Sequence, residues 1–281
     1  MVGGGIMGSG IAEVAARAGF DVLVREVTED AAEFARQRIE HSLARAVRSG
    51  KLTEDERAAT LALVQVTCDL TDLADRDVVI EAAVEDEGEK VAIFAALGAI
   101  VAPDTLLASN TSSIPIMKLA AATEHPQRVI GMHFFNPAPV LPLVELVPSL
   151  LTSGVTITRA QRFAGDALGK QTVLAKDRAG FVVNALLIPY LLAAVRMVES
   201  GFATPADIDK GMVAGCAHPM GPLALADLIG LDTTHAVAGS MYAEFKEPLY
   251  APPPLLLRMV EAGLLGRKSG RGFFSYDGLA A

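Results

Sequence analysis

Gly3-Gly-Gly5-Ile-Met-Gly8, close to the start of the chain, is the stretch that decides the fold. Its three spaced glycines form the pattern GxGxxG directly before an apolar helical pattern. There, glycines permit a tight turn and let backbone N–H groups approach a pyrophosphate at a helix N-terminus. By itself the motif is weak, because a glycine run near a chain start is as often a flexible end.

Glu26 strengthens the prediction of a dinucleotide site. It follows a short apolar strand pattern and lies 23 positions beyond Gly3, close to the spacing at which an acid binds the adenosine ribose hydroxyls. A carboxylate there repels the 2′-phosphate of NADP, so we expect NAD, although the neighbouring Arg25 is of the type that accepts such a phosphate. The cofactor contacts expected here are Gly3, Gly5, Ile6, Met7, Gly8 and Glu26.

The strand that should precede the glycine motif is almost missing. Only Met1 and Val2 stand before Gly3, which is too few for a buried strand. Either the natural start lies upstream or the central strand is truncated. In both cases we expect a first strand that is absent or very short.

The first half of the chain alternates helical and strand patterns, which predicts an α/β domain with a mostly parallel sheet. We expect helices at 8–18 and 29–49, and strands at 21–25, 77–81, 106–109, 128–133 and 143–147. After about residue 178 helix follows helix, with starts at Thr204-Pro205 and Gly221-Pro222. The prediction is a Rossmann-type NAD-binding domain over 1–178, its first strand truncated, followed by an all-helical substrate and dimerisation domain over 179–281.

Composition narrows the functional classes. The 281 residues are 51% hydrophobic and carry a formal net charge of -9, which suits a large core and argues against nucleic-acid partners. Cys68 and Cys216 form no CxxC pair, so we expect no metal site and a reducing cytoplasm. The longest uncharged run, 181–195, is shorter than the roughly 20 residues of a membrane span. We interpret it as a buried helix and expect no membrane association.

His133 is the first candidate for chemistry. It ends an apolar strand pattern, and Glu145 lies 12 positions on in the next one, so a return through the proline-rich loop between them brings the two side chains together. The pair suits alcohol oxidation, in which a base takes the hydroxyl proton and a carboxylate orients the imidazole. Judged without context, a histidine before two phenylalanines is more often a packed core residue.

Several motifs follow one another along the chain: Ser109-Asn-Thr-Ser-Ser113, His133-Phe-Phe-Asn136-Pro-Ala-Pro139 and Gly180-Phe-Val-Val-Asn184, then 218–227 and 266–274. In order and spacing they resemble the signatures of 3-hydroxyacyl-CoA dehydrogenases of the short 3-hydroxybutyryl-CoA type. The resemblance covers nearly the whole chain. It implies reversible, NAD-dependent oxidation of an (S)-3-hydroxyacyl-CoA, such as 3-hydroxybutyryl-CoA, to the 3-ketoacyl-CoA.

The same resemblance implies a catalytic set. His133 is its acid or base and Glu145 the partner of that histidine. Ser112 and Asn184 are the groups that hydrogen-bond the substrate's 3-oxygen and thioester. A serine that caps a turn and an asparagine that bonds a backbone carbonyl are the milder alternatives.

Further residues follow from the resemblance for cofactor and substrate binding. Glu85, Lys90, Ser112 and Asn136 are implied around the cofactor, and the alternative for Glu85 and Lys90 is a solvated helix start with an ordinary charge pair. For the acyl-CoA the implied residues are Ser42, Ser112 and Asn184, with Arg48 and Lys51 supplying charge to the CoA phosphates. They would replace a lysine that the family often has where Ser49 stands.

Two other functions stay open. The first is an NAD-dependent dehydrogenase of a 3-hydroxy acid that is not a CoA thioester, and the weak match at Ser49 keeps this function open. The second is a non-catalytic NAD-binding structural relative, against which the intact catalytic set argues.

Two departures from the family pattern remove no catalytic group. Ala179 stands where proline is usual, and Ala185 where arginine is common. The long apolar helix favours a homodimer.

Overall fold

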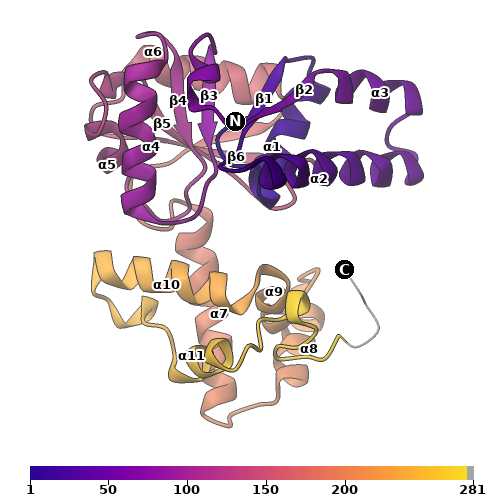
Figure 1. Ribbon diagram of the computed structural model, residues 1–281. Coiled ribbons are helices and arrows are strands. Elements are labelled where there is room, and N and C mark those ends of the chain that lie inside the picture. Colours follow the sequence, from indigo (N-terminus) through magenta and orange to yellow (C-terminus); the bar gives the residue numbers. More distant parts are fainter. Residues whose placement is uncertain (277–281) are drawn as a thin grey trace. The chain divides into compact units, whose positions relative to one another are not determined.

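The computed structural model describes residues 1–276, which form two compact units, Met1–Asp177 and a second that begins at Arg178. The first alternates strands and helices, and the second is built from helices (Figure 1). This confirms the predicted class, a Rossmann-type α/β unit followed by a helical one. No helix within residues 1–276 is both long enough and apolar enough to cross a bilayer.

Strands and helices of the first unit follow the predicted alternation, with additions. The strands are β1 (Val22–Arg25), β2 (Val64–Thr67), β3 (Val78–Glu81), β4 (Leu106–Ser109), β5 (Val129–Phe134), β6 (Leu143–Pro148) and β7 (Gln171–Leu174). The helices are α1 (Ile6–Arg17), α2 (Glu29–Arg48), α3 (Glu54–Ala62), α4 (Glu87–Ile100), α5 (Ile116–Ala121) and α6 (Gly154–Gln161). Helix α1 begins two residues before the predicted start, and the sequence patterns missed β2, β7 and α3 to α6.

Val2 lies between two strands of the sheet and pairs with both. It bridges Arg25 of β1 and Glu81 of β3, both in parallel sense, so the sheet order is β2-β1-Val2-β3-β4-β5-β6-β7. The paired strands are parallel except for β5 and β6, which are antiparallel. The prediction of a very short first strand is therefore confirmed, because one bridge residue stands where a strand is usual.

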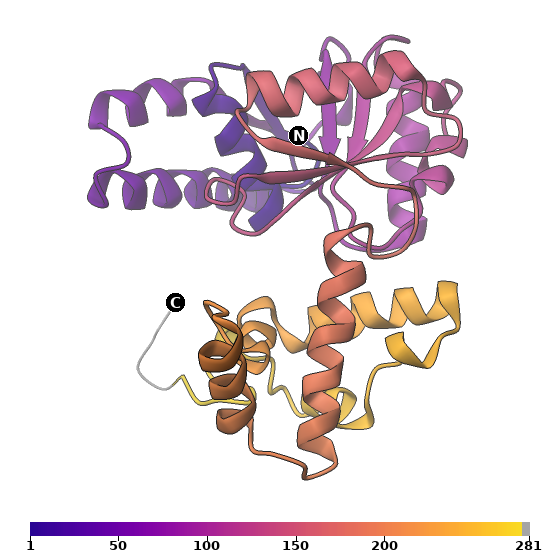
Figure 2. The same cartoon turned by 180° about the vertical axis from the view of Figure 1, so that it is seen from behind.

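Helices cover both faces of this sheet. Helices α1, α2 and α6 share a core with alternate residues of the strands, among them Leu106 and Ala108 of β4, as the two-residue period of a strand requires. Figure 2 shows α6, in pink, on the face away from α4 and α5. With both faces covered, the central strands are mostly apolar, with buried polar residues such as Glu81 and His133 near the edge that carries the site.

The topology gathers several loops at one edge. Parallel strands β1 to β5 have their carboxyl ends together, where crevices of open α/β sheets bind ligands. The segments that leave this edge begin at Glu26, Cys68, Ala82, Asn110 and Phe135. Because β6 is antiparallel to β5, the start of β6 also lies at this edge.

Five helices within the described residues form the second unit. They are α7 (Val183–Glu199), α8 (Pro205–Cys216), α9 (Pro222–Ile229), α10 (Leu231–Phe245) and α11 (Pro254–Glu261). Both predicted helix starts are confirmed, and the Thr204 side chain caps α8 by accepting from the backbone N–H of Asp207 at 3.2 Å.

The interpretation of 181–195 as a buried helix is right for only one side of the helix. Helix α7 buries Ile188, Leu191 and Val195, but Leu186 is 75% exposed. The run is uncharged all round, yet only one side of it faces the core of its own unit. One side of helix α7 is therefore buried and the other is exposed, although residues 183–195 are uncharged on both sides.

A buried carboxylate holds the end of the described chain to the second unit. Asp227 of α9 is 1% exposed. Its Oδ1 accepts from the backbone N–H of Phe273, and its Oδ2 from the N–H of Phe274 and the hydroxyl of Tyr276, all at 3.0 Å. Burial, together with the Asp227 charge, raises the pKa of Tyr276 to about 12. The tyrosine therefore remains a hydrogen-bond donor at neutral pH.

We predict that Asp227→Ala lowers the free energy of unfolding by roughly 1.5–3 kcal/mol, the range for a hydrogen bond to a charged group. Urea denaturation followed by circular dichroism measures it. Glu261→Ala, which removes an exposed ion pair with Arg258, is the control and should cost less than about 1 kcal/mol. Equal losses from the two variants would show that Asp227 is no anchor.

Candidate active site

His133 and Glu145 are direct cross-strand partners in the antiparallel β5–β6 pair. His133 Nδ1 lies 2.8 Å from Glu145 Oε2, and the side chains are 6% and 0% exposed. Opposite residues of such a pair have neighbouring Cβ atoms, so the two side chains meet without help from the loop between the strands. A carboxylate that accepts from Nδ1–H leaves the lone pair on Nε2, the arrangement of a base.

Ser112 faces the other nitrogen of the same ring. Its Oγ is 3.0 Å from His133 Nε2, and the edge of the Phe135 ring packs on the imidazole with 4.6 Å between ring centroids. The histidine is thus buried but hydrogen-bonded through both nitrogens. Apolar packing alone, the alternative weighed above, does not describe it.

Glu85 holds the loop that carries Ser112. One carboxylate oxygen, Oε1, accepts from the Thr111 hydroxyl at 2.5 Å, the Ser112 N–H at 3.0 Å and the Ser113 hydroxyl at 3.1 Å. The loop after β4 is therefore fastened to the loop after β3. Glu85 positions Ser112 in this structure.

Beneath these loops lies a buried ion pair that sequence reasoning did not foresee. Glu81, the last residue of β3, is 0% exposed, and Lys90 of α4 is 1% exposed. Lys90 Nζ donates to Glu81 Oε1 and is 3.4 Å from Glu85 Oε2. The Ser109 hydroxyl and the Ala83 N–H also donate to Glu81, each at 2.6 Å. A solvated charge pair, the alternative considered for Lys90, is therefore wrong.

The sequence analysis also missed two polar residues, and each of them ties together two segments that are distant in the chain. Asn110 Oδ1 accepts from the Phe134 N–H at 2.8 Å, which ties the end of β4 to the end of β5. Asp177 accepts from the N–H groups of Ile116 and Met117 at 2.8 and 2.7 Å, at the start of α5. Only the Ser109–Ser113 motif pointed near Asn110, and a charged linker gave no sign of Asp177.

The glycine turn meets the demands of a dinucleotide site. A Cβ on Gly8 would lie 1.9 Å from the Gly3 carbonyl oxygen, whereas one on Gly5 would meet nothing within 4 Å. No side chain caps α1 and its first turn holds no acid, so the N–H groups of Ile6 and Met7 are available to an anion.

Acidic and basic side chains border this turn. Glu26 Oε1 accepts from the Gly4 N–H at 2.6 Å. Arg38, which sequence reasoning missed, donates to the Gly4 carbonyl oxygen at 3.2 Å. With open space at Gly5, free N–H groups at a helix start and a carboxylate after β1, these residues fit NAD.

A cavity of about 390 Å³ lies between α1, α2 and the loop that begins at Asn136. Ser42 and Asn136 both line it, and so does Glu13, another residue that sequence reasoning missed. Burial raises the pKa of the Glu13 carboxyl, against the opposing effects of Ser42 and Arg17. The lining of the cavity therefore combines apolar residues with charged and polar ones, among them Glu13, Arg38 and Arg45.

Two of the remaining predicted residues of the first unit lie apart from this cluster. Arg48 and Lys51 are exposed near the end of α2, and six residues of helix place Arg48 about 9 Å along the axis from Ser42. Asn184 lies half-buried in the first turn of α7, in the second unit. Of the predicted set, the structure brings together His133, Glu145, Ser112 and Glu85, with Lys90 beneath them.

Comparison with known proteins gives matches over both units. A family model described as "3-hydroxyacyl-CoA dehydrogenase, NAD binding domain" matches residues 1–178, and one described as "3-hydroxyacyl-CoA dehydrogenase, C-terminal domain" matches residues 180–276. A Mycobacterium tuberculosis protein named 3-hydroxybutyryl-CoA dehydrogenase is 63% identical over 277 residues, which cover 98% of this chain and 97% of that protein.

Solved structures agree. M. tuberculosis FadB2 superposes with a TM-score of 0.97 at 63% identity, covering 98% of this chain and 97% of that one. PaaH1 from Ralstonia eutropha, described as an (S)-3-hydroxybutyryl-CoA dehydrogenase, gives a TM-score of 0.93 at 45% identity with the same two coverages.

Lys90→Met should destabilise the first unit by roughly 3–5 kcal/mol, because it leaves the Glu81 carboxylate buried and without its cation. The double variant Glu81→Gln/Lys90→Met removes both charges and should lose clearly less than the sum of the single variants. Urea denaturation of the four proteins gives the coupling energy. Simple additivity would show that the two charges do not stabilise each other.

Proposed function

Because the chain belongs to the 3-hydroxyacyl-CoA dehydrogenase family, we propose that it reversibly oxidises (S)-3-hydroxybutyryl-CoA to acetoacetyl-CoA with NAD. The observation that carries this proposal is the hydrogen-bonded series Ser112, His133 and Glu145 at the carboxyl edge of the sheet. The relatives' names supply the substrate, and the residues supply the chemistry.

Proton transfer is assigned to His133. Glu145 accepts from Nδ1–H, orients the ring and stabilises the imidazolium that forms when Nε2 takes the proton of the substrate hydroxyl. Ser112, whose Oγ is 3.0 Å from that nitrogen, hydrogen-bonds the 3-oxygen as its C–O bond becomes a carbonyl. In the reverse direction the imidazolium returns the proton. Asn184 is proposed, on the family resemblance, to hydrogen-bond the thioester.

NAD is held, in this proposal, by the glycine turn before α1 and by Glu26. When bound, it supplies the acceptor for the hydride that leaves C3 of the substrate. Lys90 is too deeply buried to be assigned a direct contact, so its part is to keep Glu81 and Glu85 in place. Asn136, exposed beside the catalytic histidine, is the polar residue assigned to the nicotinamide end.

The acyl-CoA is assigned to the cavity beside Ser42. Its volume of about 390 Å³ is within the range of small-molecule sites. Arg48, the last residue of α2, and Lys51, just beyond the helix, are exposed, where they can meet the phosphates of a long ligand that begins in the cavity.

The central test is an assay of NADH consumption at 340 nm with acetoacetyl-CoA, with NADPH and with free acetoacetate as comparisons. We expect turnover with the thioester and NADH, and much less with either replacement. Turnover of acetoacetate but of no thioester would favour the dehydrogenase of a free 3-hydroxy acid instead.

His133→Ala should lower kcat by about 10²–10⁴-fold, the contribution typical of a positioned acid or base. NADH binding, followed by fluorescence, should be retained. His125→Ala, at a histidine away from the site, is the matched control and should keep its activity. A His133→Ala protein that is unfolded or has lost NADH binding would instead support the core-residue interpretation.

The proposed assembly is a homodimer in the cytoplasm. Supporting it, α7 exposes Leu186, and Val213 of α8 and Leu228 of α9 are 43% and 49% exposed. The two cysteines are unpaired, as in a reducing compartment. We expect sedimentation equilibrium at micromolar concentration to give about twice the mass of the chain, and Leu186→Glu to shift that mass towards the monomer. A monomer in the unaltered protein would end this part of the proposal.

A further inference from the structure

The loop of residues 135–142, which joins β5 to β6, forms part of the wall of the cavity beside Ser42. Asn136, Pro137, Ala138 and Pro139 all line that cavity. None of the loop residues lies in a helix or a strand. The shape of the cavity therefore depends on whatever holds this loop in place. We call residues 135–142 the wall loop.

The side chain of Lys170 bonds the wall loop at two places. Its Nζ donates to the carbonyl oxygen of Ala138 at 2.7 Å and to that of Leu141 at 2.8 Å. Hydrogen bonds from a charged donor are shorter and stronger than those between neutral groups. A single ammonium group therefore joins the two ends of the turn at residues 138–141.

An internal turn and a close contact with α1 also hold the wall loop. The N–H groups of Val140 and Leu141 donate to Pro137 O, each at 3.0 Å. Ala138 is 2% exposed, and it lies so close to α1 that a Cβ on Gly10 would come within 3.3 Å of its own Cβ. Val140 and Leu141, in contrast, are 62% and 38% exposed. The part of the loop around these two residues therefore buries little apolar surface, and its position depends on the bonds from Lys170.

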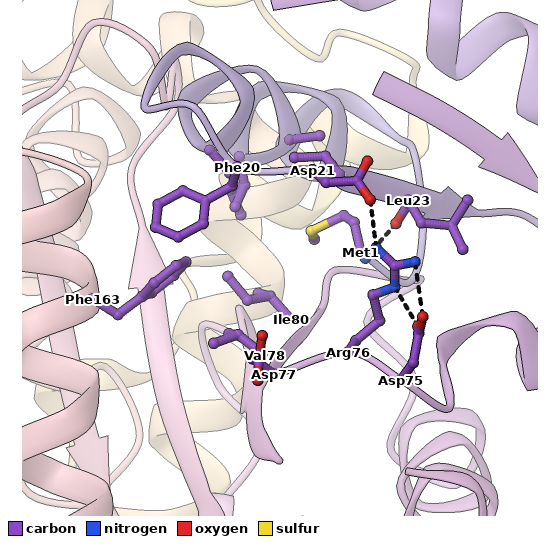
Figure 3. A pocket seen from close by; sticks show the side chains of 14 residues that line it. Met1, Phe20, Asp21, Leu23, Asp75, Arg76, Asp77, Val78, Ile80 and Phe163 are labelled. Carbon is purple, nitrogen blue, oxygen red and sulfur yellow. Dashed lines mark hydrogen bonds and ion pairs between the residues drawn. The ribbon is translucent and has the colours of Figure 1, made fainter. Parts of the chain in front are cut away.

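The segment that carries Lys170 is itself anchored. Phe163, in the helical turn Arg162–Ala167, packs edge-to-face against Phe20 with 5.5 Å between ring centroids (Figure 3). The backbone N–H of Lys170 donates to the carbonyl oxygen of Ala164 at 2.9 Å, and Ala164 is 0% exposed. The amine is therefore presented to the wall loop from a packed base.

The surroundings of the Lys170 amine disfavour an unpaired charge. Lys170 is half-buried, and burial, followed by the charge of Arg17, lowers its pKa. Taking an ammonium group out of water costs free energy unless hydrogen bonds replace the water, and Ala138 O and Leu141 O supply those bonds. An ordinary surface lysine keeps its charged head in water instead. The placement of this lysine therefore points to a task at the wall loop.

We propose that Lys170 is a positioning residue for the acyl-CoA: it holds the wall loop in the shape that the thioester ligand contacts, and so sets the affinity for that ligand. This inference rests on the proposed function, which assigns the acyl-CoA to this cavity. His133 and Glu145 are held by the β5–β6 ladder, so loss of Lys170 weakens thioester binding much more than it slows the chemical step. NAD is assigned mainly to the glycine turn and Glu26, which lie outside the wall loop, so its affinity changes little.

The main test is Lys170→Met, which keeps the apolar stem of the side chain and removes its donors. With acetoacetyl-CoA as the varied substrate and NADH saturating, we expect KM to rise roughly 10-fold, about the effect of losing one hydrogen bond to a charged group. We expect kcat to stay within about threefold, the signature of lost binding rather than lost chemistry. Lys170→Arg, whose guanidinium can donate to both carbonyl oxygens, should keep KM within about threefold of its value in the unaltered protein.

A lysine that only stabilises the fold would give a different result. Loss of folded protein lowers the apparent kcat, because fewer molecules are active, but leaves KM unchanged. Lys210→Met, at an exposed lysine of α8, is the matched control and should change neither KM nor kcat. Lys170→Gln is uncharged and too short to reach both carbonyl oxygens. It should behave as Lys170→Met does, and it supplies the measurement if the methionine variant does not fold.

Amide hydrogen exchange follows the wall loop without catalysis. In the ligand-free protein, the N–H groups of Val140 and Leu141 should exchange several-fold faster in Lys170→Met than in the unaltered chain, and Lys170→Arg should restore their protection. An unchanged KM in Lys170→Met, or equal exchange rates in the two proteins, would overturn the inference. If the unaltered protein turns over no thioester, the proposed function fails, whereas the exchange rates still report whether Lys170 holds the loop.

Discussion

The buried carboxylate of Glu81 holds part of the candidate site together, since the loops after β3 and β4 are tied to it directly or through one neighbour. It accepts from Lys90, Ser109 and the N–H of Ala83, and Lys90 in turn lies beside Glu85, which binds the loop of Ser112. An ionised group with no exposure persists only when its oxygens are hydrogen-bonded and its charge is balanced. The need to satisfy this one carboxylate therefore selects a single arrangement of the loops after β3 and β4.

On the other side of the site, the antiparallel direction of β6 positions the residues. Strands β1 to β5 have their carboxyl ends at one edge, and a further parallel strand would add only another carboxyl end there. Because β6 runs the opposite way, Glu145 lies at that edge near the start of its strand, beside His133. The proposed acid/base pair is thus held by a sheet, and the serine that faces it is held by a loop.

Features that depend on local interactions could be predicted from the sequence, whereas most features that depend on contacts between distant segments could not. Local patterns were enough for the glycine turn, for the truncated first strand and for helix starts such as Thr204-Pro205. The edge strands β2 and β7 were missed because, with one neighbour and partial exposure, they carry no long apolar run. The α7 prediction erred because an uncharged helix does not say which of its sides meets its own unit. His133 and Glu145 were brought together by spacing, since a short return predicts a pair. Glu81, Asn110 and Asp177 act across segments far apart in the chain, and no local pattern marks them.

The cross-strand register of His133 and Glu145 also bears on how such a protein can change. Backbone hydrogen bonds between β5 and β6 set the spacing of the pair, and the loop of residues 135–142 that joins these strands has no part in it. That loop carries Asn136 and borders the cavity beside Ser42. Insertions and substitutions there can reshape what enters the site while the geometry of the His133–Glu145 pair is inherited unchanged. If the proposed reaction holds, substrate range and proton transfer are, in this architecture, separately heritable traits.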